Sequence, residues 1–324
     1  MPNRAFWKAA VPVLALAACV DSQAPNAPAS PTSRFRASQL PVLSSVRVTQ
    51  AAAAPAGGGV FTITLRFVNT PTDAQRAFFE AAAAKWQGII TGDVPDVSGK
   101  FPARTCGSQF STPGFKGSID DILIDVLLQP IDGVNGVLGA SGPCLIRTAD
   151  ALTAYGVMFF DTADLQALAD EGLLDEVVVH EMGHVLGFGT LWNIGRSLLQ
   201  GSGTADPRFI GPLAISAYDK LGGSGTVPVE GDFGPGTRDS HWDEATFDNE
   251  LMTGFLNSGD NPLSALTVAA MGDLGYVIDD RAGDRYKLPR TGPAAVSASE
   301  GRTPRLGLDI ARREQLITPV AAIE

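Results

Sequence analysis

The first part of the folded body shows three periodic patterns. Residues 61–67 alternate apolar and polar side chains, which predicts a half-buried β-strand. Residues 122–128 form a nearly continuous apolar run, which is typical of a buried strand. Between the two, Thr72 and Gln75 have the spacing of a capping box that opens a helix. The apolar face of that helix is expected to consist of Phe78, Ala82, Trp86 and Ile89.

A second helical pattern ends at Gly187. Val178, Met182 and Val185 recur at helical spacing, which predicts a helix with one face anchored in the core. Gly183 stands inside this helix at a cost of about 1 kcal/mol relative to alanine, so we expect another segment to approach closely there. Gly187 stands where the helix should end, because glycine readily takes the left-handed conformation of a C-cap.

The three histidines of the chain have the arrangement that a zinc hydrolase needs. His180 and His184 are four residues apart, so both imidazoles project from one helix face, with Glu181 beside them. This string also occurs in surface helices with two solvated histidines, but the apolar opposite face argues against a surface helix here. Catalytic zinc keeps three protein ligands and leaves the fourth position to water. His241 is the only remaining histidine, and we predict that it is the third ligand.

Residues 180–187 are similar to the opening of the metzincin signature, in which a glycine turn leads to a third ligand. Thr190 stands where most metzincins place that ligand, and it is not a zinc ligand. The displaced His241, followed by Met252, resembles leishmanolysin and its relatives, whose third histidine follows an insertion and precedes a Met-turn. The resemblance implies a bacterial leishmanolysin-like metzincin in which Met252 is the Met-turn residue beneath the zinc.

The resemblance extends over residues 61–278. Residues 136–140 and 156–161 resemble the two sheet strands that precede the active-site helix of metzincins, and residues 263–276 resemble their closing C-terminal helix. By this resemblance, the strand at 137–140 forms the upper rim of the substrate cleft. An extended peptide can pair there with backbone groups.

The expected fold class is α+β with an α/β-type upper half, in a metzincin-like two-subdomain zinc protease. The upper subdomain would hold a mixed twisted sheet and the active-site helix, and the lower subdomain would be mainly irregular and helical. Along the chain we expect a signal peptide (1–18), a lipidated linker or pro-segment (19–58), the N-terminal subdomain (59–190), the C-terminal subdomain (191–280) and a flexible tail (281–324).

The start of the chain is typical of an export signal. Arg4 and Lys8 precede an apolar stretch that is too short to span a bilayer. The sequence Leu-Ala-Ala-Cys that ends at Cys19 resembles a bacterial lipobox, which implies a lipidated cysteine; an ordinary cleaved signal is the alternative. We therefore expect an exported protein that contacts a membrane only through Cys19. Leishmanolysin-type precursors can plug the zinc with a cysteine, but residues 20–58 contain none.

Composition restricts the partners further. A net charge of −11 argues against nucleic acid or an anionic membrane surface as a ligand, because both require clustered Lys and Arg. Cys106 and Cys144 are an even pair in a chain that leaves the cytosol, which predicts a disulfide, with two buried thiols as the alternative. Residues 281–324 carry eight Lys/Arg against five Asp/Glu, with prolines and weak apolar periodicity, and this indicates a flexible tail.

Several carboxylates lie near these patterns. Asp120, Asp121 and Asp125 could hold calcium, but a solvated strand edge is the favoured interpretation. Asp243 or Glu244 could orient a zinc-binding histidine, although both are also typical of surface carboxylates. We therefore include none of them in the predicted site.

These residues predict an exported zinc endopeptidase with one catalytic zinc and protein or peptide substrates. Three neutral histidines would leave the ion its full charge, which lowers the pKa of a bound water to about 7. Glu181 would take the proton of that water as it attacks a peptide carbonyl, and then pass it to the departing amine. We expect a monomer. Two alternatives remain: a surface-anchored binding protein with a non-catalytic zinc site, and a zinc hydrolase of a non-peptide substrate.

Overall fold

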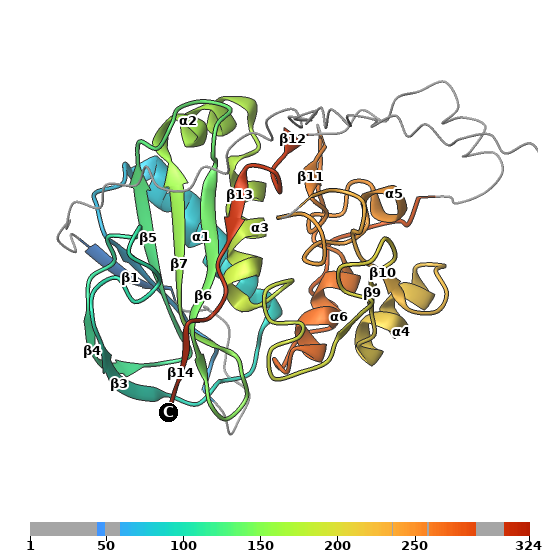
Figure 1. Ribbon diagram of the computed structural model, residues 1–324, viewed down its shortest axis with the longest axis horizontal. Helices are drawn as coiled ribbons and strands as arrows, with labels where there is room; N and C mark the ends of the chain where they lie inside the picture. Colours follow the sequence, from blue (N-terminus) through green and yellow to red (C-terminus); the bar gives the residue numbers. More distant parts are fainter. Residues whose placement is uncertain (1–43, 49–58, 235, 258, 290–307) are drawn as a thin grey trace, which may run out of the picture. The chain divides into compact units, whose positions relative to one another are not determined.

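The structure of the chain is a computed structural model that describes residues 44–48, 59–234, 236–257, 259–289 and 308–324 (Figure 1). The predicted signal peptide and Cys19 lie outside these residues, and the predicted linker is described only at 44–48. Within the described ranges, no helix is long and apolar enough to cross a membrane.

A mixed seven-stranded sheet forms the first half of the fold, as expected. Its order is β1-β2-β5-β7-β6, and β13 and β14 both pair with the outer edge of β6. β2, β5 and β7 are parallel, β1 and β6 run antiparallel to their neighbours, and β13 and β14 run parallel to β6. The strands are β1 (Ser44–Val48), β2 (Ile63–Phe67), β5 (Ile122–Gln129), β6 (Gly139–Arg147), β7 (Thr153–Asp161), β13 (Glu314–Leu316) and β14 (Ala321–Ile323).

Helices cover one face of this sheet and a small hairpin covers the other. α1 contacts β2, and α3 contacts β6 and β7. The hairpin is formed by β3 (Val97–Phe101) and β4 (Phe115–Ile119), and Phe101 stacks on Tyr155 of β7. Layers on both faces explain why the apolar run of β5 is continuous, so the prediction of a buried strand there is confirmed. The helices are α1 (Asp73–Ile89), α2 (Thr162–Glu171), α3 (Leu174–Leu186), α4 (Pro212–Lys220), α5 (Glu244–Phe247) and α6 (Ala265–Asp273).

The strand predicted to be half-buried is in fact buried on both faces. Its polar residues find internal partners: Arg66 forms an ion pair with Asp125, which also accepts a hydrogen bond from the Tyr155 hydroxyl at 2.8 Å. Asp121 accepts hydrogen bonds from the backbone N–H and the hydroxyl of Thr62. The interpretation of these aspartates as a solvated strand edge is therefore wrong for Asp121 and Asp125, which are fully buried.

Helices α1 and α3 pack closely, and two sequence features explain how. The capping box at Thr72 and Gln75 is confirmed at the start of α1. The Trp86 indole N–H of α1 donates to the main-chain oxygen of Val179 in α3 at 2.9 Å. A Cβ on Gly183 would lie 2.9 Å from the Trp86 ring, so the close approach predicted at this glycine is confirmed. On α1, the neighbour Phe79 is more deeply buried than the predicted Phe78.

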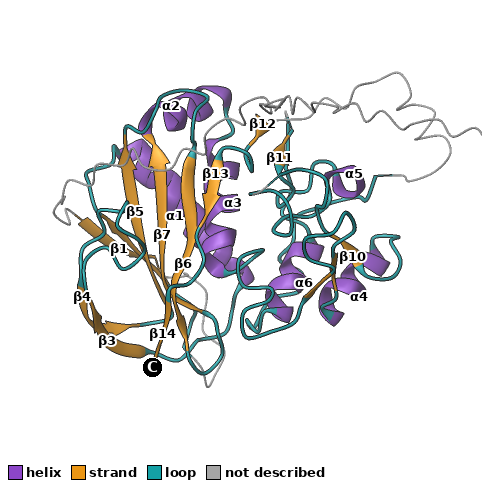
Figure 2. Cartoon of the chain, viewed as in Figure 1, coloured by secondary structure: helices purple, strands orange, loops and turns teal. Residues whose placement is uncertain are grey.

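Loops and short helices predominate in the part from residue 191 to residue 289, as Figure 2 shows. An aromatic cluster of Phe188, Trp192, Phe209 and Trp242 joins this part to the end of α3. The short strands here are β8 (Leu199–Gln200), β9 (Arg208–Phe209), β10 (Val227–Pro228) and β11 (Phe255–Leu256), and β11 pairs with β12 (Leu308–Asp309).

The end of the chain differs from the prediction of a flexible tail over residues 281–324. Residues 308–324, hereafter the C-terminal segment, form β12, β13 and β14, and β13 and β14 run beside β6 (red in Figure 1). Residues 290–307 lie outside the described ranges. An added edge strand is held by backbone hydrogen bonds, so it does not need the apolar periodicity from which a strand is normally predicted.

Candidate metal centre

All three histidines converge on one point. α3 supplies His180 and His184, and the loop before α5 supplies His241. Their Nε2 atoms lie 2.9 Å (His180 to His184), 3.1 Å (His184 to His241) and 3.2 Å (His180 to His241) apart. Each side chain is completely buried. The structure thus brings together the three residues that were singled out as ligands.

Main-chain carbonyl groups fix the protonation of these imidazoles. A carbonyl oxygen can only accept, so the nitrogen that faces it carries a proton, and in a neutral imidazole the other nitrogen then presents a lone pair. The Nδ1 atoms of His180, His184 and His241 face the oxygens of Leu251 (2.7 Å), Phe188 (2.9 Å) and Thr237 (3.1 Å). Three Nε2 lone pairs therefore point at one another, and a cation between them satisfies all three.

A fourth donor was not predicted from the sequence. Glu314, the first residue of β13, places Oε1 3.0 Å from His241 Nε2 and 3.8 Å from His184 Nε2, and Oε2 3.6 Å from His180 Nε2. Bonds of 2.0–2.1 Å to a tetrahedral zinc place neighbouring donor atoms about 3.3 Å apart. The three imidazoles and the carboxylate fit zinc in both geometry and donor type.

Glu181 lies beside the histidines in the same buried site. Its Oε2 accepts a hydrogen bond from the hydroxyl of Ser141 in β6, and its Oε1 has no hydrogen-bond partner. Burial, reinforced by the negative charge of Glu314, raises the pKa of Glu181 well above its ordinary value. Burial also opposes ionisation of Glu314, but the imidazoles of His241 and His184 outweigh it and hold the pKa of this carboxyl well below its ordinary value.

Burial favours the neutral imidazole of His184. Burial lowers the pKa of His184 well below its ordinary value, and the neighbouring histidines add to this effect. Neutral imidazole is the form that binds a metal.

Met252 packs directly beneath the helix that carries two of the histidines. A Cβ on Gly183 would lie 3.1 Å from Met252 Cε and 3.3 Å from its sulfur. The main-chain oxygen of Met252 accepts a hydrogen bond from Trp242 N–H at 3.0 Å, which ties the Met252 turn to the residue after His241. Glu250, another residue that sequence reasoning missed, accepts the Met252 N–H at 2.6 Å.

Other residues considered in the sequence have different roles. Thr190 donates its hydroxyl to the His184 carbonyl at 2.7 Å, at the end of α3. Asp243 caps α5 by accepting from the Thr246 N–H at 2.9 Å. The carbonyl groups, and not Asp243 or Glu244, orient the histidines. Burial raises the pKa of Glu244 to about 8.

The two remaining cysteines form a disulfide in the structure. Cys106 and Cys144 are joined with their Cα atoms 4.9 Å apart, and both are buried. Cys144 belongs to β6, so the disulfide anchors the loop after β3 to the strand that also carries Ser141. Neither sulfur is among the clustered metal donors of the described residues.

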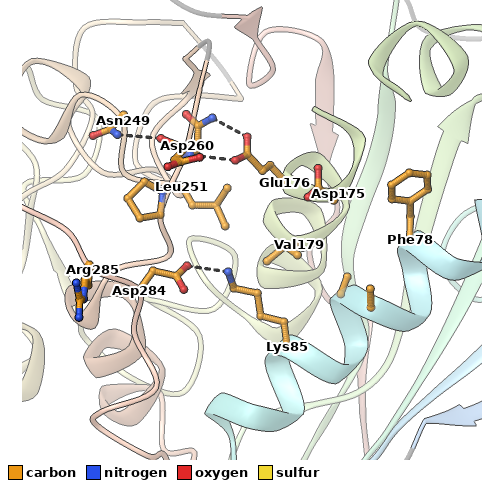
Figure 3. A pocket seen from close by; sticks show the side chains of 14 residues that line it. Phe78, Lys85, Asp175, Glu176, Val179, Asn249, Leu251, Asp260, Asp284 and Arg285 are labelled. Atoms are coloured by element: carbon orange, nitrogen blue, oxygen red, sulfur yellow. Dashed lines mark hydrogen bonds and ion pairs between the residues drawn. The ribbon is translucent and has the colours of Figure 1, made fainter. Parts of the chain in front are cut away.

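Two cavities lie in this part of the molecule. One of about 600 Å³, between α1, α3 and the segments 249–262 and 284–285, contains none of the four clustered donors (Figure 3). Lys85 and Asp284 form an ion pair across it at 2.7 Å. The other, of about 400 Å³, is lined by Glu314, Thr190 and Ser240 among other residues. Only the second therefore adjoins the metal centre.

A His-Glu-x-x-His helix with a third buried histidine and a carboxylate beside it defines the class of metal-dependent peptidases. The leishmanolysin family matches residues 82–282, which is more than half of the chain. The chain therefore belongs to the leishmanolysin family of zinc metalloproteases. The match includes His180, His184 and His241 and ends before the C-terminal segment. No curated protein matches the sequence.

Proposed function

We propose that this protein is an exported zinc endopeptidase in which His180, His184 and His241 hold the ion and Glu181 is the general base. The observation that carries the proposal is the convergence of three Nε2 lone pairs beside a carboxylate on the same helix. When bound, zinc supplies a Lewis acid and lowers the pKa of a bound water.

The residues around Glu181 suit a proton carrier. Its free Oε1 is available to take a proton from the attacking water and to return it to the leaving amine. Ser141 holds the other oxygen, so the carboxylate keeps one orientation during this transfer. A purely structural zinc site needs no such base.

Peptide substrates are supported by the edge of β6. This edge forms backbone hydrogen bonds with an extended chain, the C-terminal segment, from Gly139 to Arg147. Strand addition of this kind is a common way to bind peptides, because main-chain pairing accepts many sequences. It favours peptides over small non-peptide substrates.

A non-catalytic zinc site is the second candidate function. The Glu314 contact favours it, because structural zinc sites are closed by four protein ligands. The two candidates make opposite predictions for hydrolysis once Glu314 is removed from the site.

We also propose that the protein is a monomer anchored at Cys19 by lipid, with subdomains at 59–190 and 191–280. The lipobox-like sequence, the charged start of the chain and the family resemblance support this proposal. Calcium has no support at Asp125, whose oxygens already bind Arg66 and Tyr155.

The test uses a cleavable chain, with a specific protease site inserted between residues 289 and 308 so that the C-terminal segment can be removed after folding. We expect one zinc per chain and hydrolysis of denatured casein after cutting. Glu181→Gln in the same chain should keep the zinc and lose hydrolysis by about 10²–10⁴-fold, because only the base is removed. A zinc-loaded, cut chain that leaves casein intact would support the non-catalytic site instead.

A further inference from the structure

The C-terminal segment lies in a groove that fits it closely. Its backbone forms hydrogen bonds with β6 and with Leu138, the residue that precedes β6. The carbonyl of Arg313 accepts from the Leu138 N–H at 2.8 Å. The N–H groups of Ile317 and Val320 donate to the carbonyls of Ser141 at 2.7 Å and Cys144 at 2.9 Å. This edge of β6 is the peptide-binding edge of the proposed protease. A substrate and the C-terminal segment therefore compete for the same backbone groups.

Glycines on both walls of the groove make room for the segment. A Cβ on Gly142 of β6 would lie 2.3 Å from the main-chain oxygen of Ile317, and one on Gly236 would lie 2.6 Å from that of Ala311. Ala311 is completely buried. The C-terminal segment therefore packs closely against both Gly142 and Gly236, and a side chain at either position would collide with it.

Charged groups anchor the segment at the point where it enters the site. Arg313 donates from Nε to the carbonyl of Gly136 at 3.0 Å and forms an ion pair with the buried carboxylate of Asp164. The next residue, Glu314, turns its side chain the other way, into the histidine cluster. The Arg313 contacts therefore fix the position from which Glu314 reaches the metal centre.

Glu314 contacts only groups of the metal centre. Its side chain is completely buried, and its carboxylate oxygens lie 3.0–3.8 Å from the Nε2 atoms of the three histidines. The nearest groups are the three imidazoles that converge with it on one point. A buried carboxylate is costly unless it is hydrogen-bonded or paired with a cation. A metal ion held by the histidines would supply that charge.

We propose that the C-terminal segment is an internal inhibitor of the protease: Glu314 takes the fourth position on the metal, and β13 and β14 cover the substrate edge of β6. This inference rests on the proposed endopeptidase function. The inhibitor presents a side-chain carboxylate to Glu181 where a substrate would present a peptide bond, so it blocks the site without being cut there. The segment lies beyond the family match, so it is an addition to the matched part of the chain.

The first experiment follows activity in the cleavable chain. Cutting the chain and removing the segment should raise kcat/KM for a quenched peptide by at least about tenfold, because Glu314 and the paired strands then no longer occupy the metal centre and the edge of β6. A tenfold change corresponds to about 1.4 kcal/mol. A synthetic peptide of residues 308–324 should restore the inhibition. The same peptide with Glu314→Gln should inhibit much less, because a neutral amide is a poor zinc ligand.

The second experiment does not depend on activity and uses the uncut chain. Glu314→Ala should weaken zinc binding by at least about tenfold in a chelator competition. It should also speed amide exchange at Ile317 and Val320, because the anchor of the segment is lost. Glu324→Ala is the matched control, since it removes the same charge from an exposed position of the same segment. Arg313→Ala should speed exchange with a smaller effect on zinc, because Arg313 holds the segment and not the ion.

The outcomes separate the two proposals. Hydrolysis that is equal before and after cutting would overturn the inhibitor and leave the endopeptidase intact. Weaker zinc binding in Glu314→Ala, with no hydrolysis by the cut, zinc-loaded chain, would sink the endopeptidase and leave Glu314 as a ligand. Equal zinc affinity and equal exchange in Glu314→Ala and Glu324→Ala would overturn the inference.

Discussion

Gly183→Ala tests how tightly the metal-binding helix is held. In an exposed helix this substitution stabilises by about 1 kcal/mol, because alanine loses less backbone entropy than glycine. Here the new Cβ would lie 2.9 Å from the Trp86 ring and 3.1 Å from Met252 Cε. Trp86 is completely buried and is fixed by its hydrogen bond to Val179, so it cannot move aside. Overpacking of this kind costs about 1–3 kcal/mol.

We therefore expect Gly183→Ala to destabilise the protein by about 1 kcal/mol net, since the overpacking exceeds the gain in helix propensity. Gly272→Ala in α6 is the matched control. Its Cβ would lie 2.8 Å from the end of the Leu213 side chain and 3.1 Å from the end of the partly exposed Ile278, and Leu213, which is 48 % exposed, can rotate away. Gly272→Ala should therefore be neutral or stabilising.

The assay is urea unfolding of both variants after removal of metal, so that zinc binding does not contribute to the measured free energy. A second measurement is zinc affinity, which should fall in Gly183→Ala because the shifted helix carries His180 and His184. If Gly183→Ala were as stable as Gly272→Ala, the packing of Trp86 against α3 would be looser than we infer.

Three further predictions concern single side chains. His241→Ala should lose zinc to a chelator far more readily than Thr190→Ala, because only His241 points into the cluster; equal retention would remove His241 from the ligand set. Met252→Leu should lower the free energy of unfolding by less than about 1.5 kcal/mol, because the two side chains have similar volumes. A larger decrease, measured by thermal unfolding, would show that the thioether has a specific role. Between about pH 4.5 and the folded pKa near 8, Glu244 keeps a proton that the unfolded chain releases, so stability falls as pH rises through that window. Glu244→Gln should therefore exceed the wild type in stability by a margin that grows from about pH 5 to about pH 8, and a constant margin would contradict the burial of this carboxyl.

The sequence was most informative for α3, which contains both core residues and the histidines of the metal centre. The spacing of His180 and His184 places both imidazoles on one face whatever lies around them, and the family motif then indicates His241 across a long insertion. Local rules also predicted the capping box of α1 and the C-cap at Gly187, which has φ 118°. These features depend on neighbours within a few residues or on a motif.

The features that were missed depend on contacts between distant segments. Asp125 resembles a surface carboxylate in its strand, and only the position of Arg66 on β2 shows that it is an internal partner. Glu314 follows a basic, proline-containing stretch, and nothing nearby in sequence links it to His180. Its role depends on a parallel pairing with β6 across more than a hundred and fifty residues, about which apolar periodicity gives no information.

The disulfide makes the structure around Cys144 dependent on the redox conditions of the compartment. Cys144 lies in the irregular part of β6, where the register with β7 shifts between Pro143 and Leu145, and its carbonyl holds Val320 of the C-terminal segment. Closing a loop of 38 residues with a disulfide removes unfolded-state entropy worth about 4 kcal/mol in the chain-entropy model. In a reducing compartment the rim of the groove lacks this cross-link, and in an oxidising compartment the rim acquires it. Under the proposed export, this part of β6 would gain its cross-link only after the chain leaves the cytosol.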